Sequence, residues 1–272
     1  MRRLLLVCVS FLTLAGAEEK NDIEFARPGG VPLTLDASVP EGKGPFAAVI
    51  VVHGGGWQNG TKRSYDKPLL PVLTEAGFAW FTINYRLAPQ HKYPAAVEDV
   101  EAAVRWVRQH AKEYKVDVKR IALMGESAGG HLVAMVGVRP TKETRVAAVV
   151  DFYGPHDLYK RESERGEVGK NLSQFLGVAK LDAAGIAKLK EASPVTYVKK
   201  GLPPFLFIHG TKDAAVPYNQ SPLMCEKLKA AGNRCEVFTV EGAPHGIGAW
   251  EKNPEWTGYK KKMVEWLKAT LR

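Results

Sequence analysis

The sequence lacks internal repeats, low-complexity tracts and, beyond its N-terminal segment, any run of eighteen or more apolar residues. The absence of such a run excludes a membrane-spanning helix from the body of the chain. The composition, 45% hydrophobic and 25% charged over 272 residues, likewise excludes disordered, collagen-like and coiled-coil proteins. We therefore expect one soluble globular domain of the larger kind.

The N-terminal segment carries a shorter apolar stretch with basic residues before it. Arg2 and Arg3 precede an apolar stretch from Leu4 to Leu14, and a small-residue site of the A-x-A kind follows at 15–17. This order predicts a signal peptide over residues 1–17, a mature chain of 18–272, and a secreted or periplasmic location. An uncleaved anchor is the alternative, but the stretch is too short to cross a bilayer, so we expect no stable membrane insertion.

Cysteine is scarce, with three residues in the whole chain. Cys8 lies within the predicted signal peptide, which leaves Cys225 and Cys235 as an even pair in an exported protein. Cys225 falls on a predicted helix and Cys235 opens the next predicted strand, across a short loop. We predict a disulfide between them, with two buried free thiols as the alternative.

The formal net charge is +9, an excess of the kind found in proteins that bind nucleic acid or anionic polysaccharide. The basic residues are mixed with acids, however, as in Arg161, Glu162, Glu164 and Arg165. The pattern favours a solvated surface and no nucleic-acid partner, with attraction to acidic plant polymers as a lesser alternative.

Apolar strands and amphipathic helices alternate along the chain. The strands read as buried on both faces of a parallel sheet, and valines recur at steps of three and four in the helix that begins at Ala95. We predict an α/β protein with a mostly parallel central sheet and helices on both faces. Predicted strands are 47–52, 79–85, 120–124, 147–152, 205–209 and 235–240, after a hairpin of 22–26 and 31–35; predicted helices are 67–75, 95–113, 128–138, 219–231 and 257–271.

One stretch, residues 155–198, breaks this alternation with charges, glycines and short helical pieces. We predict a partial lid inserted over the carboxyl ends of the strands, where ligands bind in such sheets.

The strongest local motif is Gly-Glu-Ser-Ala-Gly-Gly at 125–130, between a predicted strand and a predicted helix. A serine in this turn presents its hydroxyl clear of the backbone, and the glycines permit close passage of the chain. The following helix also directs its amides at developing negative charge. Ser127 is therefore the candidate nucleophile.

A nucleophilic serine needs a base and an acid, which follow it along the chain in this type of fold. Asp213 is the single carboxylate in the loop after strand 205–209, and His245 lies in a glycine-flanked loop after strand 235–240. We predict His245 as the base and Asp213 as the acid. Asp182 remains an alternative acid, and His131 is the next histidine candidate, although it sits on the same rigid helix as the serine.

The oxyanion that forms on attack needs backbone donors. His53, three glycines and Trp57 follow strand 47–52, and consecutive glycines let their amides turn toward one point. We predict an oxyanion hole from the amides of Gly55, Gly56 and Ala128.

These motifs resemble the α/β-hydrolase superfamily over residues 22–272. HGGGW from His53 and YRLAPQHKYPAAVEDVEAAVRW from Tyr85 resemble the esterase group allied to hormone-sensitive lipase, and GESAGG agrees. HGTKDAAVP from His209 is instead similar to the acid loop of dienelactone hydrolases and prolyl oligopeptidases. With a signal peptide, the combination resembles secreted carbohydrate esterases of the acetylxylan and feruloyl esterase kind.

The resemblance implies a serine esterase that acts without metal or cofactor on a small-molecule or polysaccharide ester. Trp57, Tyr153 and Trp250 lie just beyond the predicted catalytic loops and are candidate substrate contacts, with ordinary core aromatics as the alternative. Alternatives are an arylformamidase, a peptidase of the same fold, and a non-catalytic binding protein on a hydrolase scaffold. The sequence leaves the acyl group, the alcohol and the oligomeric state open.

Overall fold

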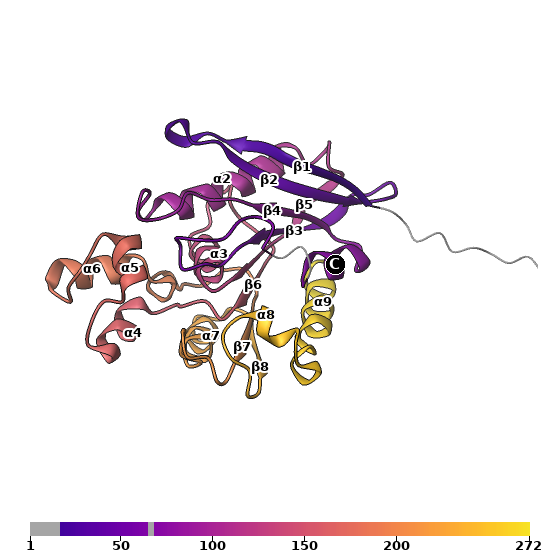
Figure 1. Cartoon of the computed structure of the whole chain (residues 1–272). Coiled ribbons are helices and arrows are strands. Elements are labelled where there is room, and N and C mark those ends of the chain that lie inside the picture. Colours follow the sequence, from indigo (N-terminus) through magenta and orange to yellow (C-terminus); the bar gives the residue numbers. More distant parts are fainter. Residues whose placement is uncertain (1–16, 65–67) are drawn as a thin grey trace, which may run out of the picture.

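The computed structural model describes residues 17–64 and 68–272, and within them the chain forms one eight-stranded sheet (Figure 1). The spatial order is β1-β2-β4-β3-β5-β6-β7-β8. The predicted signal peptide lies outside the described residues except for Ala17, at which β1 begins. The strands are β1 Ala17–Ala26, β2 Leu33–Pro40, β3 Phe46–Val52, β4 Ala79–Ile83, β5 Val116–Glu126, β6 Ala148–Phe152, β7 Phe205–Gly210 and β8 Cys235–Val240.

The sheet combines an antiparallel edge with a parallel body. β1 pairs antiparallel with β2 as the predicted hairpin, though both strands are longer than predicted, and β2 pairs antiparallel with β4. Every later pairing, from β3 with β4 to β7 with β8, is parallel. The carboxyl ends of β5, β7 and β8 therefore lie at the same edge of the sheet.

Helices cover both faces of the sheet, which confirms the predicted α/β arrangement of a mostly parallel sheet between two helical layers. On one face Ile50 of β3 shares a core with the buried valines of α2, and on the other its neighbours Val49 and Val51 pack with α1 and α9. No helix among the described residues has the length and apolar character of a membrane span. The helices that cover the sheet are α1 Leu70–Glu75, α2 Ala95–Gln109, α3 Ala128–Val138, α7 Gln220–Ala230 and α9 Tyr259–Thr270.

The predicted lid corresponds to a helical insertion between β6 and β7. Asp157 caps the first turn of α4 by accepting from the amide of Lys160, and Asp182 caps α6 by accepting from the amide of Gly185. In Figure 1 the three helices lie together at one side of the molecule. They are α4 Leu158–Arg165, α5 Lys170–Leu176 and α6 Ala183–Glu191; shorter pieces elsewhere are η1 Pro28–Gly30, η2 Pro194–Tyr197, α8 Ile247–Trp250 and η3 Pro254–Trp256.

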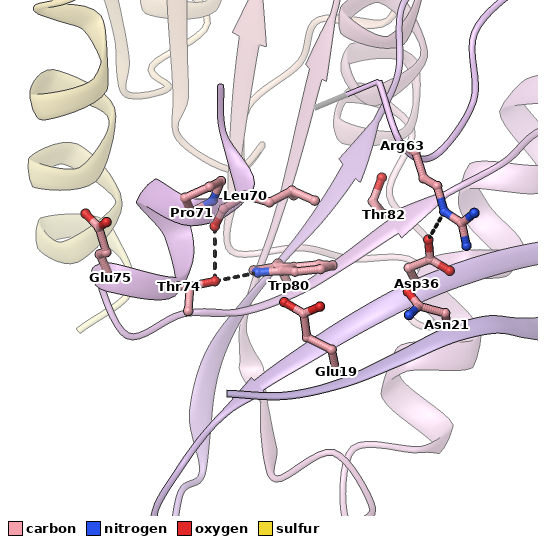
Figure 2. Close-up of a pocket in the computed structure, with 10 residues that line it drawn as sticks. All are labelled: Glu19, Asn21, Asp36, Arg63, Leu70, Pro71, Thr74, Glu75, Trp80 and Thr82. Atoms are coloured by element: carbon pink, nitrogen blue, oxygen red, sulfur yellow. Dashed lines mark hydrogen bonds and ion pairs between the residues drawn. The ribbon is translucent and has the colours of Figure 1, made fainter. Parts of the chain in front are cut away.

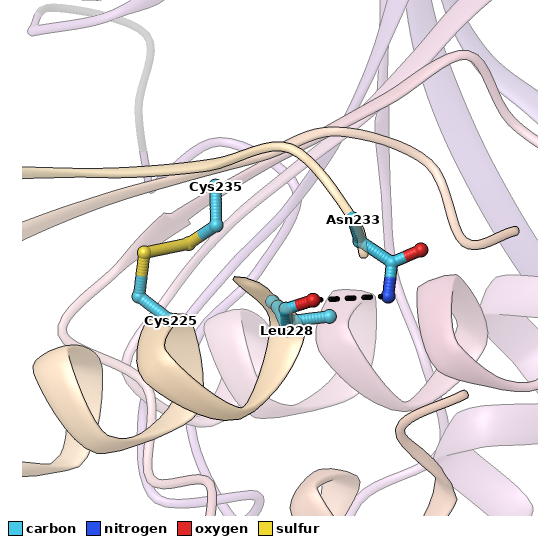
Figure 3. The surroundings of a disulfide bond; sticks show 4 residues. All are labelled: Cys225, Leu228, Asn233 and Cys235. Carbon is cyan, nitrogen blue, oxygen red and sulfur yellow. Dashed lines mark hydrogen bonds between the residues drawn. A yellow bond between two sulfur atoms is a disulfide. The ribbon is translucent and has the colours of Figure 1, made fainter. Parts of the chain in front are cut away.

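Cys225 and Cys235 are joined by a disulfide, as Figure 3 shows. The bond ties α7 to β8, the last strand of the sheet. In the same turn the Asn233 side-chain amide donates to the carbonyl of Leu228, with Nδ2 and O 3.2 Å apart. The loop between α7 and β8 is thus held by a covalent bond and a polar contact.

Replacing both cysteines with serine is expected to lower the free energy of unfolding by about 3 kcal/mol, because the unfolded chain gains the entropy of an open loop. Urea denaturation of wild type and variant measures the difference. Reductant should destabilise the wild type similarly and leave the double variant unchanged; equal stability of all forms would contradict the prediction.

Candidate active site

Ser127 occupies a sharp turn between the end of β5 and the start of α3. Its backbone has φ 53° and ψ −114°, a combination that L-residues rarely adopt. A Cβ on Gly125 would lie 2.3 Å from the carbonyl oxygen of Gly129, and one on Gly129 would lie 2.2 Å from that of Val52. The two glycines thus allow the chain to pass close to its neighbours and hold the serine at the sheet edge.

The structure brings Ser127, His245 and Asp213 together. His245 lies after β8 and Asp213 after β7, and the imidazole spans the gap between the other two side chains. Its Nε2 is 3.0 Å from Ser127 Oγ, and its Nδ1 is 2.6 Å from Asp213 Oδ2. With the ring proton on Nδ1, the serine hydroxyl donates to Nε2, which is the arrangement a general base requires.

The carboxylate of Asp213 is fully buried but well supplied with donors. Its Oδ1 accepts from the amides of Ala215 and Val216, each at 2.8 Å. Burial alone would raise the pKa of Asp213, but hydrogen bonds from His209 and His245 outweigh it and hold the pKa well below its ordinary value. Asp213 therefore stays ionised and stabilises positive charge on His245.

The alternative residues for these roles lie elsewhere. Asp182 is the cap of α6, engaged with Gly185. His131 is fully buried in α3, where its Nδ1 accepts from Trp57 Nε1 and its Nε2 donates to the carbonyl of Ala192, at 3.2 and 2.8 Å. Neither residue is among those that line the cleft at Ser127.

A cleft of about 580 Å³ opens at Ser127, and we name it the Ser127 cleft. The predicted oxyanion residues Gly55, Gly56 and Ala128 line it together with His245. Gly55 has φ 106° and Gly56 has φ 60°, so both adopt backbone conformations that favour glycine. Ala128 is the first residue of α3, and the amides of a first helical turn have no partner within the helix.

Of the three predicted substrate contacts, only Trp57 lines the Ser127 cleft. Trp57 is 4% exposed and stacks on Phe175 of the insertion, with ring centroids 4.7 Å apart. Tyr153 and Trp250 have no exposed surface, so their prediction as substrate contacts is corrected: both are core residues.

The two buried aromatics support the loop that carries His245. The Tyr153 hydroxyl accepts from the amide of Ile247 at 2.7 Å, and its ring lies 4.7 Å from that of His245. Trp250 Nε1 donates to the carbonyl of Pro244 at 2.7 Å. Sequence position placed these residues near the site, but only the packing shows which side of the loop they occupy.

The insertion supplies one wall of the Ser127 cleft, and three of the lining residues are basic: Arg161, Arg165 and Lys170. From the sequence we expected both arginines on the solvated surface; Arg165 is exposed as expected, but the Arg161 side chain is only 15% exposed, and both line the cleft. Their spacing of four on one helix, α4, was the available signal.

A second cavity lies at the antiparallel edge of the sheet, between β1, β2, β4 and α1 (Figure 2). Two pairs of its polar groups contact each other: Trp80 Nε1 donates to Thr74 Oγ1 at 2.9 Å, and Arg63 Nε donates to Asp36 Oδ2 at 3.1 Å. None of Ser127, His245 and Asp213 lines it. Nor do the described residues contain a group of three His, Cys, Asp or Glu placed to hold a metal ion.

A buried acid lies behind the serine turn. Asp151 lies near the carboxyl end of β6. Its Oδ1 accepts a hydrogen bond from the amide of Gly154 at 2.8 Å and lies 3.7 Å from His156 Nε2. Burial raises the pKa of Asp151 to about 8 and lowers that of His156 well below its ordinary value. Both side chains are therefore neutral at neutral pH.

This shift predicts a pH-dependent stability that Asp151→Asn removes. Between pH 3.8, the ordinary pKa, and about 8 the folded chain binds one more proton at Asp151 than the unfolded chain, so this group's contribution to the free energy of unfolding falls as pH rises. Asparagine keeps the bond to Gly154 without the ionisation. Urea titrations across this range should show the free energy of unfolding of the variant rising relative to that of the wild type up to about pH 8 and then staying level. His156 has the opposite effect on the pH dependence of stability, but it is present in both proteins. A difference in the free energy of unfolding that does not change with pH would contradict the prediction.

The chain is similar to known esterases in sequence and in structure. A sequence model of the BD-FAE family matches residues 35–228. The chain is 32% identical over 205 residues to a probable carboxylic ester hydrolase, LipM, of Mycobacterium tuberculosis, covering 72% of this chain and 48% of LipM. It is 33% identical over 217 residues to esterase LipC of the same organism, covering 75% and 53%. The chain thus spans about half the length of these curated relatives.

Solved structures match over nearly the whole chain. A truncated carbohydrate esterase from gut microbiota superposes with a TM-score of 0.77 at 27% identity, covering 93% of this chain and 96% of the other. A thermophilic esterase from Thermogutta terrifontis with propionate bound gives a TM-score of 0.76 at 30% identity, covering 93% and 94%. The same esterase has also been solved phosphonylated by sarin, with a TM-score of 0.77 at 30% identity and coverage of 93% and 94%.

Proposed function

Since the chain belongs to the BD-FAE family and has the α/β-hydrolase fold, we propose that it is a serine-dependent carboxylic ester hydrolase. One observation carries the proposal: the His245 ring lies within hydrogen-bonding distance of both the Ser127 hydroxyl and the Asp213 carboxylate. The roles of these three residues follow from the chemistry of their side chains.

In the first half of the reaction Ser127 Oγ attacks the ester carbonyl while His245 Nε2 takes the hydroxyl proton. The carbonyl oxygen becomes an oxyanion, which the amides of Gly55, Gly56 and Ala128 stabilise. The tetrahedral intermediate then expels the alcohol, which receives the proton from Nε2. An acyl group remains on Ser127.

In the second half a water molecule takes the place of the alcohol. His245 Nε2 removes a proton from the water as it attacks the acyl carbonyl, and then returns a proton to Ser127 Oγ as the carboxylic acid leaves. Asp213 keeps the imidazole in the tautomer with Nδ1 protonated and stabilises its charged form. No metal or cofactor takes part in the proposed sequence.

For the substrate we propose short-chain or aromatic acyl esters, carried by a carbohydrate. The support is the similarity to a carbohydrate esterase and to an esterase solved with propionate or butyrate bound. We further propose export from the cytosol, supported by the N-terminal sequence pattern and by the Cys225–Cys235 bond, which is typical of oxidising compartments.

A substrate panel tests this function against its alternatives. Acetylated xylan and methyl ferulate are expected to be hydrolysed, whereas N-formylkynurenine and a short proline peptide represent the arylformamidase and peptidase alternatives. Turnover of N-formylkynurenine or the peptide with no ester cleavage would replace the proposal. No turnover at all, together with no labelling by a serine-directed fluorophosphonate, would favour a binding protein.

A further inference from the structure

The ionisable side chains that line the Ser127 cleft are unequally distributed. The insertion contributes Arg161 and Arg165 from α4 and Lys170 from the start of α5, whereas Glu126 is the acidic member of the lining. Glu126 adjoins Ser127 in the sequence, whereas the three cations all belong to the insertion. The basic part of the cleft lining is therefore supplied by the insertion.

Arg161 is held in place but keeps unused donors. Its side chain is 15% exposed, and its Nε lies 3.2 Å from Oε1 of Glu162, a fully buried residue whose Oε2 accepts from the amide of Gly169 at 2.5 Å. Within the described part of the chain no acceptor is found for the Nη atoms of Arg161. A guanidinium has five N–H donors, so this fixed side chain retains several for a ligand.

Arg165 and Lys170 extend the basic side toward solvent. Arg165 Nε lies 3.5 Å from Glu167 Oε1, whose side chain is 72% exposed and free to move away. For Lys170 no ion pair is found among the residues that the structure describes. Both cations can therefore contact a charged group on a ligand without breaking a buried interaction.

From this arrangement we propose that the preferred substrate is an ester that carries a free carboxylate, such as a uronic acid with an acyl group on one of its hydroxyls, bound by Arg161, Arg165 and Lys170. Planar guanidinium groups match the two oxygens of a carboxylate. The three cations attract the anionic end of the substrate to the insertion, which leaves the ester carbonyl for Ser127. The inference rests on the proposed esterase function and specifies its substrate class.

Two matched substrate pairs test the inference, each differing only in whether one remote carboxyl is free or present as the neutral primary amide. One pair, acetylated galacturonic acid and its galacturonamide, has the charge on the alcohol; the other, the mono-4-nitrophenyl ester of adipic acid and its amide, has it on the acyl group. We expect kcat/KM for the carboxylate to exceed that for the amide by about ten-fold in at least one pair. Added salt should reduce this ratio, because exposed charges are screened.

Variants identify the side chains responsible. Arg165→Gln combined with Lys170→Gln should lower the carboxylate-to-amide ratio by about five-fold, since two exposed cations are lost. Arg161→Gln should lower the ratio further, but this change leaves Glu162 buried without its cationic partner. If Arg161→Gln fails to fold, the ratio measured for the double variant alone tests the inference. Lys160→Gln is the matched control: Lys160 lies on the same helix, pairs with Glu164 and does not line the cleft.

The outcomes separate the two proposals. Hydrolysis of 4-nitrophenyl acetate with a ratio near one in both pairs overturns the inference and leaves the esterase function standing. So does a ratio that Lys160→Gln reduces as much as the double variant does. Failure to hydrolyse any ester, 4-nitrophenyl acetate included, overturns the esterase function, and the inference with it.

Discussion

Ser127→Ala is expected to lower kcat/KM for 4-nitrophenyl acetate by about 10⁴-fold or more, because no other hydroxyl is held 3.0 Å from His245 Nε2 in the described residues. What remains would come from binding and the oxyanion amides alone. Initial rates at several substrate concentrations, with wild type and variant at matched protein concentration, give the comparison.

The loss must come from the hydroxyl and not from unfolding. Circular dichroism and the midpoint of thermal unfolding should therefore be close to those of the wild type, and a fluorophosphonate probe should label the wild type but not Ser127→Ala. Ser163→Ala serves as the matched control, because Ser163 is exposed on α4 and does not line the cleft. Retention of a large part of the activity by Ser127→Ala would remove the basis of the proposed mechanism.

Asp213→Asn is expected to lower kcat by about 10³- to 10⁴-fold with little change in the fold. Asparagine keeps an oxygen for the amides of Ala215 and Val216, but it presents an NH₂ group to His245 Nδ1. That group donates to Nδ1, so the ring proton moves to Nε2, which can no longer accept from Ser127. Steady-state kinetics on 4-nitrophenyl acetate measures the effect.

Asp182→Asn is the companion variant, since Asp182 was the other acid that the sequence allowed. Asparagine also caps helices well, so α6 should form and activity should stay within about two-fold of wild type. If Asp182→Asn were the variant that lost activity and Asp213→Asn the one that kept it, the assignment of the acid would be wrong.

The fold was predictable where one physical signal dominates. The spacing of Val97, Val100 and Val104 indicated the buried face of α2, and the continuous apolar strands indicated a parallel sheet, because strands covered on both faces need no polar side. Boundaries were less certain: α2 ends at Gln109, and β5 begins at Val116 rather than 120. These ends depend on capping and strand pairing, which hydrophobic periodicity does not encode.

The candidate site was predictable to the same degree and for a similar reason. Ser127, Asp213 and His245 each follow a strand in a recognisable loop, and parallel strands end at one edge. Tyr153, Trp250 and Arg161 were misassigned, because the side that a residue faces is decided by tertiary packing. An arginine on an exposed helix and one in a cleft have the same local sequence signature.

The helical insertion leaves the sheet after β6 and returns at β7, the neighbouring strand, and Ser127, Asp213 and His245 all lie outside it. The residues proposed to cleave the ester and the basic residues proposed to select it therefore lie in separate segments of the chain. Because the ends to be joined are already adjacent, replacing this stretch with one of another length costs little loop-closure entropy. Grafting insertions from related enzymes onto this sheet is accordingly a practical route to new selectivity that leaves the reaction chemistry in place.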